Sequence, residues 1–367
     1  MIVAVVGVGL IGGSVGLAAR SRLGATVRGV DPQADAALRR GAIDSAHRDL
    51  GDALDGADAA FVAVPVDRLA EVVGDVLRAA PERCVVTDVG STKRAVIDAG
   101  RDPRFVGGHP LAGSEASGVE HAREDLFDGA TWYLTPTTAT QGVLLERLHR
   151  LLTGIGARPS AIDAEVHDRV LAAVSHLPHV VANVLVARAA EALGTERPPA
   201  TGPSFRDATR VAGANPELWG AIYAANRDAL AAALDDAIAD LQGVRDDLRG
   251  GADLTAWQER AAASRRTLLE AGLGQGAVRE VRVAVPNRPG VIADIALTLG
   301  RAGINISDMA LSPSPDNSQG EIALWVPDER ADEAVGLVAG LGFAVISPDG
   351  LTPPPASRAR TAGGGEA

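Results

Sequence analysis

The sequence predicts an α/β part with a parallel sheet, then an all-α part, then a small α+β part. Apolar strands alternate with helical segments in the first part, helical periodicity without strands follows, and strands return after a glycine-rich linker at Gly272–Gly276. The 367 residues are enough for two or three domains. We expect domains at residues 1–160, 161–272 and 278–348, and a disordered tail at 352–367 that is rich in Pro, Gly and Ala.

Composition limits the possible partners and the compartment. The net charge of −12 argues against binding to nucleic acid or to an anionic membrane. The one cysteine, Cys84, has no partner for an internal disulfide, as expected in the reducing cytoplasm. The first residues form a strand-like run without a basic segment, unlike a signal peptide. We find no run of ~18 uncharged apolar residues and therefore expect no membrane span.

The first strand leads into a glycine motif that opens a helix. In order, the segments are the strand Met1–Val8, the motif Gly7-Val8-Gly9-Leu10-Ile11-Gly12, the helix Ser14–Arg20, and the strand Thr26–Val30 that ends in Asp31. Strand, motif, helix and acid in this order form the dinucleotide-binding fingerprint of a Rossmann domain.

Each part of this fingerprint has a physical role. Gly7 makes the tight turn, Gly9 lets the pyrophosphate reach the backbone, and Gly12 lets helix and strand pack closely. The N–H groups of the first helical turn, at Leu10-Ile11, attract the phosphates. Asp31 would accept the ribose 2′-hydroxyl and would repel a 2′-phosphate, so we expect NAD as cofactor rather than NADP.

Further strands continue the α/β alternation. They are expected at Ala59–Val64, Cys84–Thr87 and Thr131–Thr135, with a helix at Val143–Thr153. Ligands of such sheets bind beyond the carboxyl ends of the strands, which is where the run Asp88–Lys93 lies.

Two residues of that run are candidates for the site. Ser91 fits equally well as the N-cap of a helix Lys93–Ala99 and as a substrate contact. Lys93 is the single lysine among 35 basic residues, all the others being arginine. Chance would explain this, and so would a substrate contact that a compact ammonium fits and a planar guanidinium does not.

The stretch Val106–Gly118 follows another strand end and is crowded with small residues. It holds one histidine, His109, beside Pro110, and one carboxylate, Glu115. Its glycines permit backbone shapes that other residues resist, so a substrate could approach the main chain. A surface loop with an incidental histidine is the alternative interpretation.

Three histidines lie in the helical part, at His167, His176 and His179. Pro178 should kink its helix, and His176 and His179, three residues apart, share roughly one face. They could be a metal pair, two satisfied core histidines, or substrate contacts. No Glu-x-x-His repeat or further cysteine completes a metal site, so we expect no metal.

One arginine of the helical part lies among Ala, Val and Gly residues. Such a guanidinium, at Arg210, favours an anion, ideally a carboxylate that accepts two hydrogen bonds. An ion pair with Asp207 is the alternative. Downstream, Ala221–Leu248 is predicted to be one Ala-rich amphipathic helix that packs on another helix, within or between subunits.

The last part has the β-α-β-β-α-β order of a ferredoxin-like fold. We expect strands at Arg279–Val285, Asn305–Leu311, Glu321–Val326 and Ala344–Ser347, and helices at Val291–Arg301 and Ala331–Leu341. The turn formed by Arg288, Pro289, Gly290 and Val291 would leave N–H groups exposed for a small carboxylate, and Asn305 could meet an amino acid from the neighbouring side.

With these segments placed, residues 1 to about 270 closely resemble the prephenate dehydrogenase family of tyrosine biosynthesis. The resemblance is carried by GVGLIGGS, DVGSTK, GGHPLAGSE, SHLPH, and FRDATR followed by Trp219. The last domain resembles an ACT domain through Asn287–Val291 and Gly303–Ile306. The resemblance implies an N-terminal Rossmann domain, an all-α dimerisation domain and a C-terminal ACT domain, in a homodimer.

The resemblance also implies a reaction and roles for the site residues. His109 would be the catalytic histidine, Ser91 would share the substrate hydroxyl with it, and Arg210 would take a substrate carboxylate. Further active-site positions of the family match His179, His167 and Glu115. The implied reaction is the NAD-dependent oxidative decarboxylation of prephenate to 4-hydroxyphenylpyruvate. Since the product of this reaction leads to tyrosine, we expect tyrosine to bind the ACT domain as an inhibitor, with phenylalanine as the alternative.

Three alternatives remain open. Arogenate, which has an amine in place of the ketone, could be the substrate. A non-catalytic protein that senses NAD and amino acids is disfavoured by the set of His109, Ser91 and Arg210. A β-hydroxyacid dehydrogenase would carry a catalytic lysine in the helical part, and this chain has none there.

Overall fold

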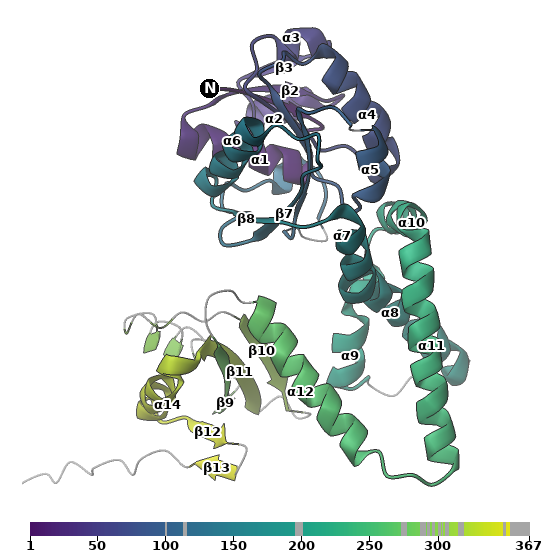
Figure 1. The fold of residues 1–367 in the computed structure, drawn as a ribbon. Coiled ribbons are helices and arrows are strands. Elements are labelled where there is room, and N and C mark those ends of the chain that lie inside the picture. The colour runs from purple at the N-terminus through teal and green to yellow at the C-terminus, as the bar shows by residue number, and fades with distance from the viewer. Residues whose placement is uncertain are drawn as a thin grey trace, which may run out of the picture. The chain divides into compact units, whose positions relative to one another are not determined.

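The fold is that of a computed structural model of the chain (Figure 1). The structure describes residues 1–99, 101–112, 116–194, 201–272, 277–286, 291, 294–295, 298–299, 302, 304, 308–314, 319–347 and 350–352. The chain divides into two compact units, one made of Met1–Pro199 and Asp207–Leu241, the other of Ala200–Arg206 and Gln242–Ala367.

An eight-stranded sheet is the framework of the first unit. Its strands are β1 (Ile2–Val6), β2 (Thr26–Val30), β3 (Ser45–His47), β4 (Ala59–Val62), β5 (Val85–Asp88), β6 (Phe105–Pro110), β7 (Thr131–Thr135) and β8 (Arg158–Ala161). They lie in the order β3-β2-β1-β4-β5-β6-β7-β8, and only the β6–β7 pair is antiparallel. The expected α/β class is confirmed.

Helices cover both faces of this sheet (Figure 1). One face carries α1 (Leu10–Leu23), α2 (Ala34–Arg40) and α6 (Gly142–Gly154), and the other carries α3 (Leu50–Leu54), α4 (Val66–Ala79) and α5 (Arg94–Ala99). A short 3-10 helix, η1 (Val119–His121), packs against α1 and α2. Because both faces are covered, the central strands are continuous apolar runs rather than alternating ones.

Two positions of the stretch Val106–Gly118 are glycine for a different reason from the one expected. Gly107 and Gly108 lie in strand β6, not in a loop. A Cβ on Gly107 would lie 2.3 Å from Thr135 Oγ1, and one on Gly108 would lie 2.5 Å from the Asp88 carbonyl oxygen. They are therefore glycines because neighbouring strands fill the space, and the loop interpretation was wrong for this half of the stretch.

The all-α part is confirmed, with two local differences. Its elements are α7 (Ala164–Leu171), the π-helical turn η2 (Ala172–His176), α8 (Leu177–Leu193), α9 (Pro203–Thr209), η3 (Arg210–Gly213), α10 (Pro216–Ala225), α11 (Arg227–Arg249) and α12 (Thr255–Gly272). Pro178 is the second residue of α8, which follows the π-helical turn, so the irregularity expected near the proline takes this form. The single helix predicted at Ala221–Leu248 is instead two helices that meet at Asn226.

One helical stretch is apolar enough to be compared with a membrane span. Ala164–Leu193 passes that test by length and composition. Its most apolar window is 22% buried in the single chain. One helix of this kind is weak evidence for a span, because the core helix of a soluble protein passes the same test.

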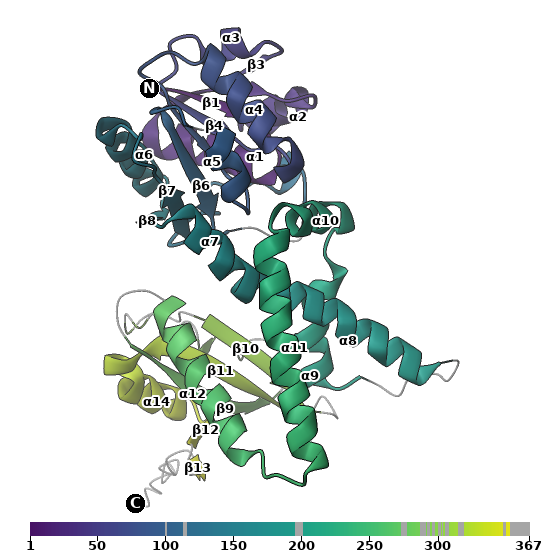
Figure 2. The same ribbon diagram turned by 45° about the vertical axis from the view of Figure 1, so that its right-hand side comes forward.

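A five-stranded antiparallel sheet is the framework of the second unit (Figure 2). Its order is β10-β11-β9-β12-β13, from β9 (Val278–Pro286), β10 (Asp308–Pro313), β11 (Gln319–Pro327), β12 (Ala344–Ser347) and β13 (Gly350–Thr352). The 3-10 helix η4 (Asp328–Arg330) leads into α14 (Ala331–Gly340), which packs on the sheet around Val283, Leu324 and Val338.

The predicted α+β class of the last part agrees with this sheet. Thr352, predicted as the start of the tail, instead pairs with Val345 in the sheet. The rest of the tail, and most of the helix predicted at Val291–Arg301, lie outside the described residues.

The glycine motif after β1 has the geometry that the fingerprint requires. Gly7 has a φ of +89°, which favours glycine. A Cβ on Gly12 would lie 2.0 Å from the Gly7 carbonyl oxygen, whereas a Cβ on Gly9 would meet nothing within 4 Å. The space beside Gly9 is therefore free of protein atoms, while Gly12 is fixed by packing.

Gly12→Ala and Gly9→Ala should separate these two roles. We expect Gly12→Ala to lower the free energy of unfolding by about 1–3 kcal/mol through overpacking. Gly9→Ala should stay within about 0.5 kcal/mol of the wild type, since its methyl group enters open space. Urea unfolding of the ligand-free proteins measures both, and equal losses would contradict the packing argument.

Candidate active site

A buried ion pair lies at the carboxyl end of β5. The Lys93 ammonium donates to Asp88 Oδ2 and, at 2.6 Å, to the Gly108 carbonyl oxygen, and both charged side chains are fully buried. Asp88 in turn accepts from the backbone N–H of Gly108 at 3.0 Å and of Gly90 at 2.8 Å. The pair therefore fastens β5 to β6 directly beside His109.

This arrangement changes the interpretation of Lys93. Its ammonium is occupied by Asp88 and a carbonyl oxygen and is 0% exposed, so the predicted direct contact with substrate is wrong. Burial lowers the pKa of Lys93, and the charge of Asp88 opposes that shift. The solitary lysine is explained by a space that admits a compact ammonium.

A chain of three side chains begins at His109. His109 Nδ1 lies 2.9 Å from His167 Nε2, and His167 Nδ1 lies 2.8 Å from Asp168 Oδ1. His109 comes from β6, and the other two come from α7. His167 is fully buried, so its place is behind His109, which it orients, and not against the substrate. This differs from the substrate contact predicted for His167.

The hydrogen bonds among these three side chains fix which nitrogen of each imidazole ring carries hydrogen. Burial by itself would raise the pKa of Asp168, but hydrogen bonds from His167, Arg94 and Lys93 outweigh it and hold that pKa below its ordinary value. The ionised carboxylate can only accept, so His167 Nδ1 carries hydrogen and His167 Nε2 accepts from His109 Nδ1. His109 Nε2 is therefore left with a lone pair.

His109 is neutral at physiological pH. Its pKa lies well below the ordinary histidine value, first because of burial and then because positive charge at His167, Lys93 or His176 would disfavour its protonation. A neutral imidazole with a free Nε2 lone pair can accept a proton from a hydroxyl group.

Asp168 also caps helix α5. Its two carboxylate oxygens accept from the backbone N–H of Lys93 at 2.8 Å and of Arg94 at 2.9 Å. The N-cap that the sequence offered to Ser91 is thus supplied from α7. Ser91 is half-buried.

A second cluster of rings surrounds Trp219. The His179 ring stacks on the indole with 3.4 Å between ring centroids, and His176 meets it edge-on at 6.1 Å. His176 is buried, which lowers its pKa to about 4, and its Nδ1 lies 3.1 Å from Asn226 Nδ2. His176 is thus a satisfied core histidine, and His179 is the half-buried member of the pair.

No metal arrangement is found near these histidines. Among the described residues, no group of three or more His, Cys, Asp and Glu side chains is placed to hold a metal ion. The two histidines that could have formed a metal pair contact an amide and an indole instead.

The remaining predicted substrate residues differ in how far the structure places them. Arg210 begins η3, which packs against α8, the helix that carries His179. The Arg210 side chain is exposed rather than in apolar surroundings. Glu115 lies outside the described residues. Of the predicted set, the structure brings His109 and His167 into contact.

The acid of the fingerprint organises the cofactor edge of the sheet. Asp31 Oδ2 accepts from Val8 N–H at 2.8 Å, and Asp31 Oδ1 accepts from Gln33 N–H at 2.7 Å. Each oxygen keeps a further lone pair for a hydroxyl group. The first bond of α1 runs from Gly13 N–H to the Gly9 carbonyl at 2.8 Å, so the N–H groups of Leu10 and Ile11 precede any helical partner.

Sequence reasoning missed three polar residues of this site. Asp88, Asp168 and Asn226 are all buried and hydrogen-bonded. Asp168 directly follows His167 in the sequence, and a histidine next to an acid on an apolar helix was a usable signal. No local pattern distinguished Asn226 from its helical surroundings.

The fold and the buried histidine pair define a dehydrogenase with a nucleotide-binding domain. Family models for prephenate dehydrogenase match its nucleotide-binding domain at residues 15–160 and its dimerization domain at residues 163–255, and an ACT domain model matches residues 279–339. The chain belongs to the prephenate dehydrogenase family, whose members are oxidoreductases.

Individual relatives agree with this assignment. The chain is 32% identical over 341 residues to prephenate dehydrogenase of Bacillus subtilis, over 88% of this chain and 92% of the relative. The structure of A. aeolicus prephenate dehydrogenase in complex with hydroxyphenyl propionate and NAD+ superposes with a TM-score of 0.66 at 29% identity, over 73% of this chain and 98% of that chain. Synechocystis arogenate dehydrogenase superposes with a TM-score of 0.61 at 29% identity, over 74% and 99% of the two chains.

Lys93→Met tests the buried ion pair. It should lower the free energy of unfolding by about 3–5 kcal/mol, because the Asp88 carboxylate is left buried without its partner. The double variant Lys93→Met with Asp88→Asn should recover part of this loss, since no charge is then buried. Urea unfolding of both variants gives the comparison, and a double variant no more stable than Lys93→Met would contradict the pairing.

Lys93→Arg should also lower the free energy of unfolding, because the larger guanidinium does not fit the space.

Proposed function

We propose that this chain catalyses the NAD-dependent oxidative decarboxylation of prephenate to 4-hydroxyphenylpyruvate in tyrosine biosynthesis. The observation that carries the proposal is the hydrogen-bonded chain from Asp168 through His167 to His109, which leaves His109 Nε2 as a proton acceptor. The family relationship and the dinucleotide fingerprint support it.

NAD fits the residues of the cofactor edge. Gly9 leaves room for a pyrophosphate beside the first turn of α1, with the N–H groups of Leu10 and Ile11 as donors, while Gly7 and Gly12 shape the turn. Asp31 would accept a ribose hydroxyl and would repel a 2′-phosphate. Bound NAD supplies the hydride acceptor.

The chain's own part in the reaction is to move one proton and to orient one anion. His109 Nε2 takes the hydroxyl proton of the substrate as negative charge builds on that oxygen. The Asp168 carboxylate, acting through His167, stabilises the imidazolium that forms. Loss of the ring carboxylate gives an aromatic product, so little assistance is needed at that group.

The proposed substrate contacts are Ser91, Arg210, His179 and Glu115. Ser91 would share the substrate hydroxyl with His109. Arg210 would hold a carboxylate, because its fork of N–H donors matches two oxygens. His179, held flat against Trp219, and Glu115 complete the proposed set.

Arogenate is the second candidate substrate. One structural neighbour is an arogenate dehydrogenase with a TM-score of 0.61 to this chain. The two substrates share the ring at which the chemistry occurs and differ at the side chain, which bears a ketone in prephenate and an amine in arogenate.

We also propose a homodimer in the cytoplasm. The dimerization domain model covers residues 163–255, and α8 in that range exposes several large aliphatic side chains in the single chain, at Val181, Val184, Leu185 and Val186. A second copy would cover such a face.

The single cysteine of the sequence, Cys84, is buried, which raises its pKa to about 12 and makes it an inert thiol.

Tyrosine is the proposed effector of the ACT domain. Four of the residues predicted to bind it, Arg288, Pro289, Gly290 and Asn305, lie outside the described residues. Val291 is 2% exposed and packs in the core of the domain, so its side chain does not line a surface site. The support for this proposal is the domain itself together with the expected pathway product.

A turnover assay tests the function directly. We expect the full chain to reduce NAD in the presence of prephenate, with lower specificity constants for arogenate and for NADP, and tyrosine should lower the rate. NADH formation measured by absorbance for the four pairs of substrate and cofactor decides the assignment. Turnover of arogenate alone would select the second candidate, and turnover of neither would overturn the proposal.

His109→Ala should lower kcat by about 10²–10⁴-fold, the usual contribution of a positioned base. NAD affinity should be unchanged, because His109 lies on β6 and not in the glycine motif. In the wild type the base must be neutral, and its pKa is lowered, so the acidic limb of the kcat/KM profile should fall below about pH 6.5. Steady-state kinetics across pH with NAD titration measures both, and an acidic limb above that pH would contradict the assignment of His109.

A further inference from the structure

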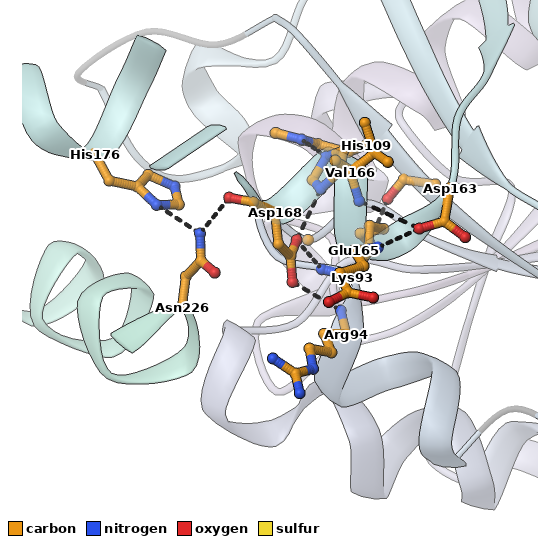
Figure 3. A network of polar contacts seen from close by, with 12 residues as sticks. Lys93, Arg94, His109, Asp163, Glu165, Val166, Asp168, His176 and Asn226 are labelled. Atoms are coloured by element: carbon orange, nitrogen blue, oxygen red, sulfur yellow. Dashed lines mark hydrogen bonds and ion pairs between the residues drawn. The ribbon is translucent and has the colours of Figure 1, made fainter. Parts of the chain in front are cut away.

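Asn226 lies at the junction of two helices and contacts two parts of the site. It follows α10 and precedes α11, and it is 5% exposed. Its Nδ2 donates to the Asp168 carbonyl oxygen at 2.8 Å and lies 3.1 Å from His176 Nδ1 (Figure 3). Neither contact is needed to end α10, since Asn226 N–H already bonds to the Ile222 carbonyl at 3.0 Å.

The two contacts fix the protonation of His176. A carbonyl oxygen can only accept, so the amide nitrogen of Asn226, not its oxygen, faces Asp168. The second hydrogen of that nitrogen points to His176 Nδ1, which must then accept. His176 is therefore neutral, with its hydrogen on Nε2, in agreement with its pKa of about 4.

One contact leads to the proton acceptor. Asp168 is the residue whose carboxylate holds His167 and, through it, His109. By fixing the carbonyl of Asp168, Asn226 fixes the backbone from which that carboxylate extends. A neutral His176 also leaves no positive charge behind His109, where such a charge would oppose proton uptake.

The other contact leads to the ring cluster. His176 meets Trp219 edge-on with an interplanar angle of 80°, and Trp219 is stacked on His179 at an interplanar angle of 22°. Rotation of His176 would remove the support behind Trp219 and change the plane of His179. Asn226 is thus the residue that touches both the Asp168 side and the His176 side of the site.

We propose that Asn226 is a positioning residue for the reaction, which uses its two amide hydrogens to align the base His109 with the ring pair of His179 and Trp219. This inference rests on the proposed function for its kinetic consequences. Its structural content, the hydrogen on His176 Nε2, can be tested in the free protein without a substrate.

The first test is nitrogen-15 NMR of histidine-labelled full-length protein. We expect the His176 resonances, assigned by their loss in His176→Gln, to show a protonated Nε2 and an unprotonated Nδ1 at neutral pH. In Asn226→Asp the new carboxylate replaces the donor beside Nδ1, so the His176 ring should become protonated at Nδ1 near neutral pH. A wild-type His176 with hydrogen on Nδ1 would overturn the inference.

The second test compares Asn226→Leu with a matched control. Asn226→Leu keeps a similar volume and removes both donors, and we expect kcat/KM to fall about 10- to 100-fold, with kcat lowered and KM raised. The control is Asn215→Ala at the other end of α10, where Asn215 caps the exposed N–H groups of Glu217 and Leu218. It should lower stability and leave kcat and KM unchanged.

The kinetic and NMR results separate the positioning role of Asn226 from the proposed function. Wild-type kinetics in Asn226→Leu, or the same kinetic loss in Asn215→Ala, would overturn the positioning role. A wild-type chain that is inactive with both substrates would overturn the proposed function and leave the NMR result to decide the hydrogen position. If Asn226→Leu does not fold, the kinetics of Asn226→Asp against the same control decide the role.

Discussion

The Asp168 carboxylate is the interaction on which the rest of the site depends. It is buried, it accepts from two backbone N–H groups at the start of α5, and it accepts from the imidazole of His167. A carboxylate with three donors is stabilised in its charged form in spite of burial. It therefore joins α7 to the start of α5, and through His167 it orients the base His109.

The buried Lys93–Asp88 pair supplies a second constraint. Removing two charges from water is costly, and such pairs often add little net stability. What this pair provides is geometry, because its hydrogen bonds hold Gly90 and Gly108 on both sides of the strand end. Strand β6 can approach so closely only because Gly107 and Gly108 lack side chains. His109 then projects from a rigid strand rather than from a loop.

Burial and hydrogen bonding act together on the histidines. Burial, followed by the charges of neighbouring groups, lowers the pKa of His109 and keeps it neutral, which makes it available as a proton acceptor but a weak one. The negative charge of Asp168, transmitted through His167, compensates once the proton arrives. His176 also has a hydrogen-bond donor beside it. The Asn226 amide donates to His176 Nδ1, and only an unprotonated Nδ1 can accept that hydrogen bond.

The sequence by itself indicated the alternation of strands and helices, the dinucleotide fingerprint and His109 as the candidate base. These depend on local periodicity and on motifs of adjacent residues, which survive without knowledge of distant contacts. Only the tertiary structure decided that Val106–Pro110 is a strand, that Lys93 is a buried partner of Asp88, and that Asp168 caps α5 in place of Ser91. It also broke the predicted helix Ala221–Leu248 at Asn226. In each case the deciding hydrogen bond joins residues far apart in the chain or in different elements, and no local pattern encodes such a contact.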